Sequence, residues 1–104
     1  MAGGKRDESI AQSDGAAVRE VCILNRLGLH ARASAQFVRI AEQFRAEVTV
    51  ELGGQRVNAK SIMGLLMLAA CQGTTLTLRA TGQDSEAAVE ALADLVARRF
   101  GEPE

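Results

Sequence analysis

Apolar and polar residues alternate along four segments of the chain, and a period of two is typical of β-strands with one buried face. The four segments are 18–24, 48–52, 55–58 and 74–81. The pair Gly53-Gly54 separates the middle two, and paired glycines favour a tight reversing turn. We therefore predict four strands, of which the middle two form a hairpin.

Three other segments have apolar residues at the spacing of amphipathic helices. They are 31 to about 44, 61 to about 70, and 84 to about 100. In the first of them, the predicted core stripe consists of Ala35, Val38, Ile40 or Ala41, and Phe44. The last begins near the acidic Asp84, which suits the positive end of a helix, and Gly101 suits a left-handed position after its end.

The resulting order, βαββαβα, predicts an α+β fold. A four-stranded antiparallel sheet with three helices on one face is the simplest way to bury one side of every element. Residues 1–17 are mostly Gly, Ala, Ser and charged residues, so we predict a disordered N-terminal tail. The predicted domain then covers 18–101, and 102–104 form a short C-terminal tail.

The only histidine, His30, lies where the first predicted strand gives way to the first helix. The first N–H groups of a helix lack intrahelical partners and stabilise an anion. Arg32 adds a planar cation, and neutral imidazole is nucleophilic near pH 7. His30 and Arg32 are therefore candidates for phosphoryl chemistry, although a lone histidine is more often an ordinary surface or core residue. Gly28 either ends the strand or permits close contact between two backbones.

Two segments together resemble the HPr family, the histidine-containing phosphocarriers of the bacterial phosphoenolpyruvate-dependent phosphotransferase system. Residues 28–32, Gly-Leu-His-Ala-Arg, are similar to its active-site loop, and residues 57–64 are similar to its regulatory-serine segment. The resemblance covers about residues 18–101 and implies an open-faced β-sandwich. It also implies that His30 accepts a phosphoryl group on Nδ1 from Enzyme I and passes it to an Enzyme IIA-type protein. HPr kinase/phosphorylase would phosphorylate Ser61.

Ser61 precedes an apolar run, so we also expect it to be a helix N-cap, a role worth about 1 kcal/mol. The helix after it is apolar on all sides. Leu65 and Leu68 fit a core stripe, which leaves a second apolar face either for a partner or for further core packing. The predicted partner-binding residues are Leu27, Ile62, Met63, Leu66 and Met67.

Composition excludes several other classes of protein. The net charge is −1 and the only aromatic residues are three Phe, which disfavours nucleic-acid binding. Cys22 and Cys71 are too few for a disulfide framework and have no metal-ligand spacing, so we expect free thiols, no metal and no cofactor. With no signal peptide or membrane span in the sequence, we expect a cytoplasmic monomer.

One position in the active-site loop differs from the members of the HPr family that serve sugar transport. Sugar-transport members usually have Pro after the active-site Arg, whereas this chain has Ala33. A helix can begin without that Pro, so the fold does not depend on it. Because the Pro is missing, sugar transport cannot be assumed, and a nitrogen-type regulatory relay is equally open. We expect a stoichiometric carrier and not an enzyme. The alternatives are a regulatory interaction module and an acylphosphatase-like hydrolase, for which the convergent catalytic groups are missing.

Overall fold

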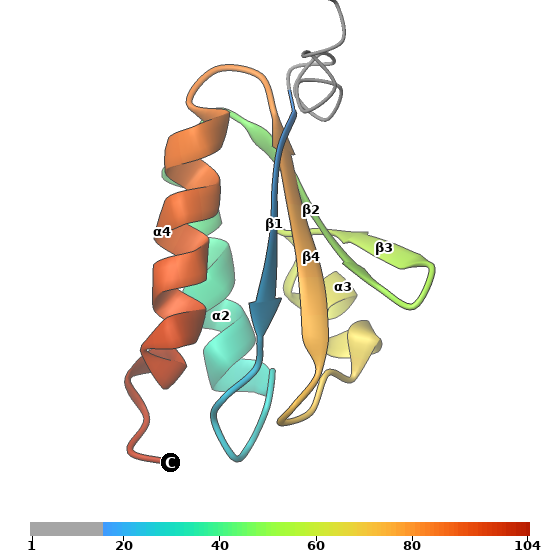
Figure 1. Cartoon of the computed structure of the whole chain (residues 1–104), viewed down its shortest axis with the longest axis vertical. Helices are drawn as coiled ribbons and strands as arrows, with labels where there is room; N and C mark the ends of the chain where they lie inside the picture. Colours follow the sequence, from blue (N-terminus) through green and yellow to red (C-terminus); the bar gives the residue numbers. More distant parts are fainter. Residues whose placement is uncertain (1–15) are drawn as a thin grey trace, which may run out of the picture.

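A computed structural model describes residues 16–104 and confirms the expected order of elements (Figure 1). The strands are β1 (Ala16–Cys22), β2 (Glu47–Leu52), β3 (Gln55–Asn58) and β4 (Thr75–Thr81). The helices are α2 (Ala31–Ala41), α3 (Ile62–Leu68) and α4 (Ser85–Ala97), followed by a 3-10 turn at Arg99–Gly101. The α+β class predicted from the sequence is therefore correct.

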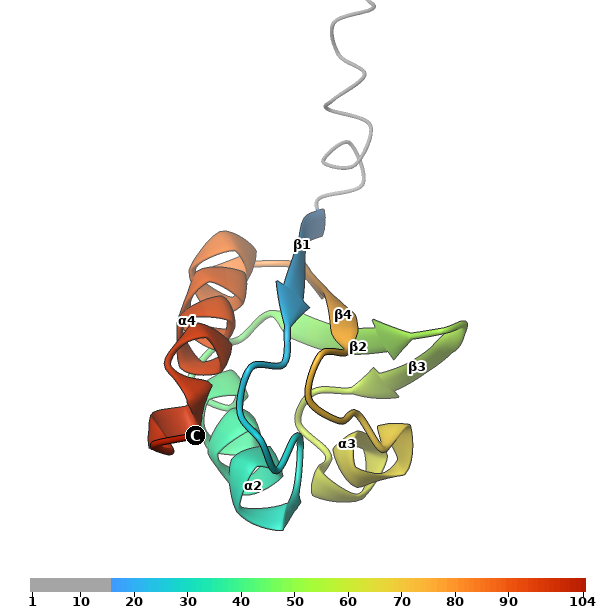
Figure 2. The same ribbon diagram turned by 60° about the horizontal axis from the view of Figure 1, so that its bottom comes forward.

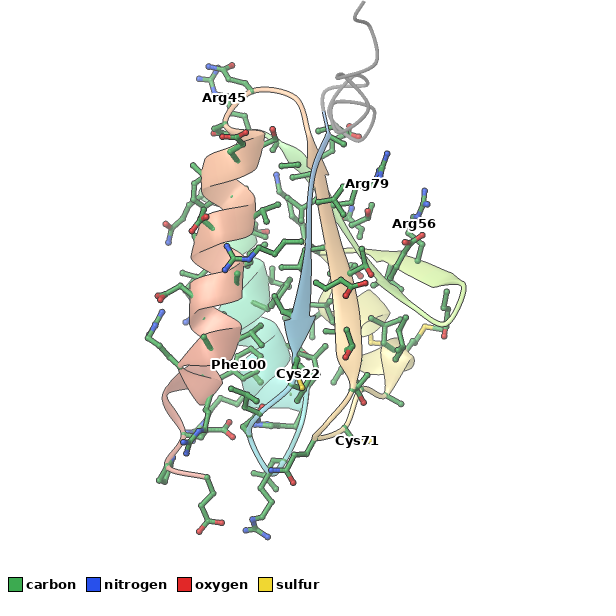
Figure 3. The ribbon with its side chains drawn as sticks, viewed as in Figure 1. Cys22, Arg45, Arg56, Cys71, Arg79 and Phe100 are labelled. Carbon is green, nitrogen blue, oxygen red and sulfur yellow. The ribbon has the colours of Figure 1, made fainter. Side chains whose placement is uncertain are left out.

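The strands form one antiparallel sheet in the order β1-β4-β2-β3. The three helices lie on the same side of this sheet (Figure 2). Arg56 and Arg79 extend from the side turned away from α2 and α4 (Figure 3). The architecture is thus the expected open-faced β-sandwich, in which the helices of residues 16–104 all cover one face of the sheet.

The core lies between the covered face of the sheet and the helices. In β4, Leu76, Leu78 and Ala80 are all fully buried, as their alternation with more polar residues predicts. Across the sheet, Leu78 pairs with the buried Val50 of β2. The period of two along the strands therefore identified the buried face correctly.

The buried stripe of α2 differs from the predicted stripe. Phe37 is fully buried, whereas Ala35 and Phe44 are only half-buried. After Ala41 the N–H of Glu42 still bonds to Val38 O, but those of Gln43 and Phe44 bond to carbonyls only three residues back, as in the bond from Phe44 N–H to Ala41 O at 3.2 Å, and the α-helix ends. The buried residues of α2 are Ala33, Ser34, Phe37, Val38 and Ala41.

Both ends of the described chain also differ from the predicted boundaries. Ala16 and Ala17, assigned to the tail, belong to β1, where Ala16 pairs with Thr81. The prediction of disorder for residues 1–15 lies outside the described residues. At the other end, α4 stops at Ala97, and Phe100 reaches the core through a turn with a φ of +57°.

Two kinds of feature are absent from residues 16–104. No helix there is long and apolar enough to cross a membrane, since the longest, α4, has 13 residues. In the same range, no three His, Cys, Asp or Glu side chains come together in a way that could hold a metal ion.

Candidate functional site

The loop between β1 and α2 packs closely against the chain that follows α3. Gly28 has a φ of +70°, and a Cβ atom at this position would lie 2.6 Å from the carbonyl oxygen of Ala70. The next residue, Leu29, donates its N–H to that same oxygen at 2.9 Å. Of the two roles open for Gly28, the structure therefore supports close contact between two backbones.

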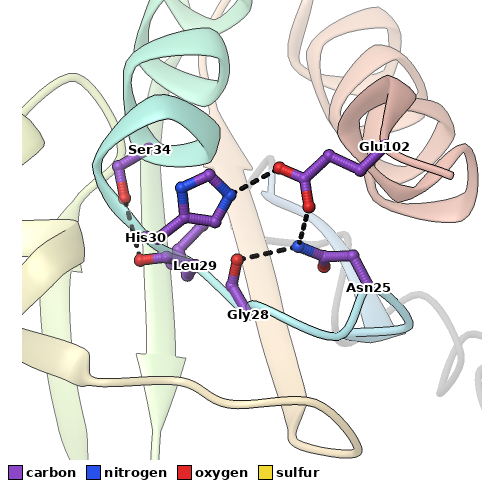
Figure 4. Close-up of polar contacts among 6 residues, drawn as sticks. All are labelled: Asn25, Gly28, Leu29, His30, Ser34 and Glu102. Carbon is purple, nitrogen blue, oxygen red and sulfur yellow. Dashed lines mark hydrogen bonds and ion pairs between the residues drawn. The ribbon is translucent and has the colours of Figure 1, made fainter. Parts of the chain in front are cut away.

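Asn25 is fully buried and stabilises this loop from inside. Its Nδ2 donates to the carbonyl oxygen of Gly28 and to Oε1 of Glu102, both at 2.9 Å (Figure 4). Ser34 Oγ adds a third bond by donating to Leu29 O at 3.2 Å. Because these bonds join parts of the loop to each other, to α2 and to the C-terminal segment, the loop has a defined shape at the start of α2.

His30 is the N-cap residue of α2, and its carbonyl accepts the first helical bond from Ser34 N–H at 2.8 Å. Its side chain is 28% exposed. Nε2 contacts Oε2 of Glu102 at 2.5 Å, whereas Nδ1 has no hydrogen-bond partner among the described residues. Nδ1 lies on the side of the ring nearer the first turn of α2 (Figure 4). An anion on Nδ1 would therefore lie close to the positive end of a helix.

Arg32 lies in the same open hollow as His30, so the structure brings the two predicted site residues together. The hollow has a volume of about 490 Å³. Its lining consists of Arg26, Leu27, His30, Arg32 and the C-terminal residues Glu102, Pro103 and Glu104. Arg26 forms an ion pair with Glu104 at 2.8 Å, so Arg32 is the guanidinium group of this hollow that is left to face an added anionic group.

Glu102 is the site residue that sequence reasoning missed. Residues 102–104 were predicted to be a tail outside the domain, yet the Glu102 side chain is only 13% exposed and contacts both His30 and Asn25. No local pattern marks this position, because the contact joins residues 72 positions apart.

The charge on Glu102 is favoured by its surroundings. Burial by itself raises the pKa of the carboxyl group. The hydrogen bonds from Asn25 and His30, with the positive charges of His30 and Arg32, outweigh burial and lower the pKa below its ordinary value. The site at neutral pH therefore contains a carboxylate that only accepts hydrogen bonds.

The C-terminal segment is attached to the loop at further points. Arg26 donates its N–H to the carbonyl oxygen of Glu104 at 2.8 Å, and its Nε lies 2.8 Å from Oε1 of the same residue. Arg99 donates to the carbonyl oxygen of Pro103 at 3.0 Å. These contacts fix the chain that follows Glu102 and so help to place its carboxylate beside His30.

The helix after Ser61 has the two apolar faces predicted for it. Ser61 is the N-cap, as expected, and its Oγ accepts the N–H of Gly64 at 3.0 Å. Leu65 and Leu68 are buried, and Leu66 is half-buried. Four of the five predicted partner-binding residues are exposed, namely Leu27, Ile62, Met63 and Met67. We call these four residues the apolar patch.

An open-faced sandwich with a histidine at the start of its first helix is the arrangement of a histidine phosphocarrier domain. A family model described as the phosphorylation site of the HPr component of the phosphotransferase system matches residues 17–98. The chain therefore belongs to the HPr family of phosphocarrier proteins.

Individual relatives agree with this membership. The phosphocarrier protein HPr of Cupriavidus necator is 50% identical over 86 residues, which cover 83% of this chain and 97% of that protein. The phosphocarrier protein NPr of Shewanella violacea is 45% identical over 84 residues, or 81% and 92% of the two chains. A crystal structure of HPr from Thermoanaerobacter tengcongensis has a TM-score of 0.82 and 43% identity, covering 85% of this chain and 99% of that one.

Proposed function

We propose that the protein carries a phosphoryl group on Nδ1 of His30, accepts it from an Enzyme I-type donor and passes it to an Enzyme IIA-type acceptor. One observation supports this most directly. Nε2 is occupied by Glu102, whereas Nδ1 has no partner among the described residues and lies at the N-terminus of α2. The nitrogen available as a nucleophile is therefore the one closest to positive charge.

The surroundings of His30 suit one half of a phosphoryl-transfer site. Such transfer depends mainly on in-line positioning and on compensating charge on the phosphoryl oxygens. The helix N-terminus and Arg32 supply positive charge, and the hollow beside His30 is open to a partner protein. A docked partner would supply the remaining groups. The protein would then act as a stoichiometric carrier and would not need a complete catalytic site of its own.

Mass spectrometry tests this function directly. The protein is incubated with phosphoenolpyruvate and Enzyme I, handled at alkaline pH to preserve phosphohistidine, and compared with His30→Ala. We expect one acid-labile phosphoryl group on His30 and none on the variant. An unlabelled wild-type protein with several Enzyme I homologues would favour an interaction module over a carrier.

We further propose that phosphorylation of Ser61 reduces transfer through His30. Ser61 Oγ already accepts the N–H of Gly64, so a phosphate there would lie at a helix start and leave the fold intact. It would also place negative charge beside the exposed Ile62 and Met63. Docking of a partner on the apolar patch would then require desolvation of that charge.

A kinase assay tests this regulatory step. HPr kinase/phosphorylase and ATP should label the wild-type protein and leave Ser61→Ala unlabelled. The labelled protein should then accept phosphoryl groups from Enzyme I at least several-fold more slowly. An unmodified Ser61, or equal rates before and after labelling, contradicts the proposal.

A second candidate is that the acceptor belongs to a regulatory relay and not to sugar transport. Ala33 in place of the usual Pro and the similarity to a protein named NPr favour it. The phosphorylated protein should be mixed with Enzyme IIA proteins of the sugar and nitrogen types. Faster transfer to the nitrogen type would support the regulatory relay, and faster transfer to the sugar type would contradict it.

A further inference from the structure

A continuous set of hydrogen bonds leads from the loop backbone to the ring of His30. The carbonyl oxygen of Gly28 accepts from Asn25 Nδ2, and Asn25 Nδ2 also donates to Oε1 of Glu102 (Figure 4). The other carboxylate oxygen, Oε2, contacts Nε2 of His30. Each carboxylate oxygen of Glu102 therefore has a different partner, one buried amide and one imidazole.

The direction of every bond in this set is determined by its first member. A backbone carbonyl can only accept, so Gly28 requires the NH2 end of the Asn25 amide. The same NH2 group then donates to Glu102, and the Oδ1 of Asn25 is left without a partner among the described residues. Because a carboxylate only accepts, Nε2 of His30 must be the donor and bears the ring proton.

A proton on Nε2 leaves the lone pair of the neutral ring on Nδ1. We propose that Glu102, oriented by Asn25, is a positioning residue that keeps His30 in the tautomer able to accept a phosphoryl group on Nδ1. This inference rests on the proposed function, because it assigns the group that prepares His30 for that reaction. A carboxylate that fixes a histidine tautomer has the same effect in other nucleophilic sites.

The transfer step then needs no proton to leave the ring. The lone pair of Nδ1 forms the new N–P bond while the N–P bond of the donor's phosphohistidine breaks, and its electron pair returns to the donor nitrogen. The proton stays on Nε2, and the positive charge that develops on the ring lies next to the carboxylate of Glu102. In the onward step the pair of the N–P bond returns to Nδ1 as the acceptor forms its own bond to phosphorus.

Replacing Glu102 by Gln gives a sharp test, because the direction of the Asn25 amide also dictates the direction of the Gln amide. Asn25 Nδ2 would still donate to the Gln oxygen, so the Gln NH2 group would face Nε2. It would donate to Nε2 and move the ring proton to Nδ1, which blocks the nucleophile. Glu102→Ala lacks this group and leaves the ring without a preferred partner.

The tautomer is read from the nitrogen chemical shifts of His30 in the unphosphorylated, full-length protein above pH 8. We expect the proton on Nε2 in the wild-type protein and on Nδ1 in Glu102→Gln. Glu90→Gln is the matched control, since Glu90 lies on α4 outside the hollow and its carboxylate contacts Arg19 and not His30. A proton that stays on Nε2 in Glu102→Gln overturns the proposed positioning role.

The rate of phosphoryl transfer from Enzyme I gives the second readout. Glu102→Gln should be slower than the wild-type protein by roughly tenfold or more, and slower than Glu102→Ala. Glu90→Gln should stay within about twofold of the wild type, as expected for an exposed ion pair. A Glu102→Gln protein as fast as wild type contradicts the inference. A wild-type protein that accepts no phosphoryl group contradicts the proposed function instead, and the tautomer still decides the positioning role.

Discussion

Arg32 is exposed on the first turn of α2, so removing its guanidinium leaves the packing of the helix unchanged. Arg32→Ala should slow transfer to and from His30 by about tenfold or more, because a fixed cation near the phosphoryl oxygens is lost. The melting temperature should be unchanged. Arg39→Ala, an exposed arginine in the last turn of the same helix, is the control. Equal rates with both donor and acceptor would remove Arg32 from the site.

Glu102 should make the stability of the protein sensitive to acid. Its pKa is lower in the folded protein than the ordinary value of 4.5, so its contribution is complete above that pH and is lost as the pH falls through the folded pKa. Glu102→Gln should therefore cost about 1 to 2 kcal/mol at pH 7 and progressively less below pH 4.5. Urea unfolding at several pH values measures this difference. A loss of unfolding free energy that does not change with pH would contradict the lowered pKa of Glu102.

Those site residues could be predicted whose type and position in the sequence are informative by themselves. His30 and Arg32 precede or begin a helix, and Ser61 stands before an apolar run, so each has a local signal. Asn25 and Glu102 have none, because their roles arise only when the C-terminal segment meets the loop. A site that depends on such distant contacts requires the folded structure.

Among the elements, the loop before α2 depends on a backbone contact with the chain after α3. Gly28→Ala should destabilise the protein by more than about 2 kcal/mol, because it adds a clash with Ala70 O to the strain of a positive φ. Gly53→Ala is the control, since Gly53 has a φ of +56° but no atom within 4 Å of the added Cβ. It should cost only about 1 kcal/mol. Equal losses measured by urea unfolding would mean that the contact with Ala70 is unimportant.

The elements themselves followed from the sequence, but their ends did not. The period of two and the helical spacing gave the correct order, and Ser61 is the expected cap. The negative charge of Asp84 was expected to stabilise the positive N-terminal end of α4. Asp84 is the N-cap residue of α4, and its carboxylate in addition accepts the N–H groups of Arg45 and Ala46 at 3.1 and 3.0 Å. Periodicity contains no information about such tertiary bonds, and it places the end of a helix only to within a few residues.

The apolar patch is the surface of residues 16–104 best suited to a protein partner. Met63 is 69% exposed, so Met63→Glu should leave the melting temperature unchanged. It should weaken binding to Enzyme I by about tenfold, because a charge at the centre of an apolar contact must be desolvated. Titration calorimetry measures the affinity.

Val18→Glu is the matched control for this surface. Val18 is also exposed, at 42%, but it lies on the edge strand β1 and outside the apolar patch. It should bind Enzyme I like the wild type. Equal affinity of both variants would show that the patch is not the docking surface.

The attachment of residues 102–104 to the His30 loop has a practical consequence for all these measurements. Anything joined to the protein after Glu104 would emerge beside the hollow that contains His30 and Arg32. The start of β1 lies at the opposite end of the molecule (Figure 1). Purification tags and fluorescent labels are therefore better placed before β1 than after Glu104, where they would lie in the approach of partners to His30.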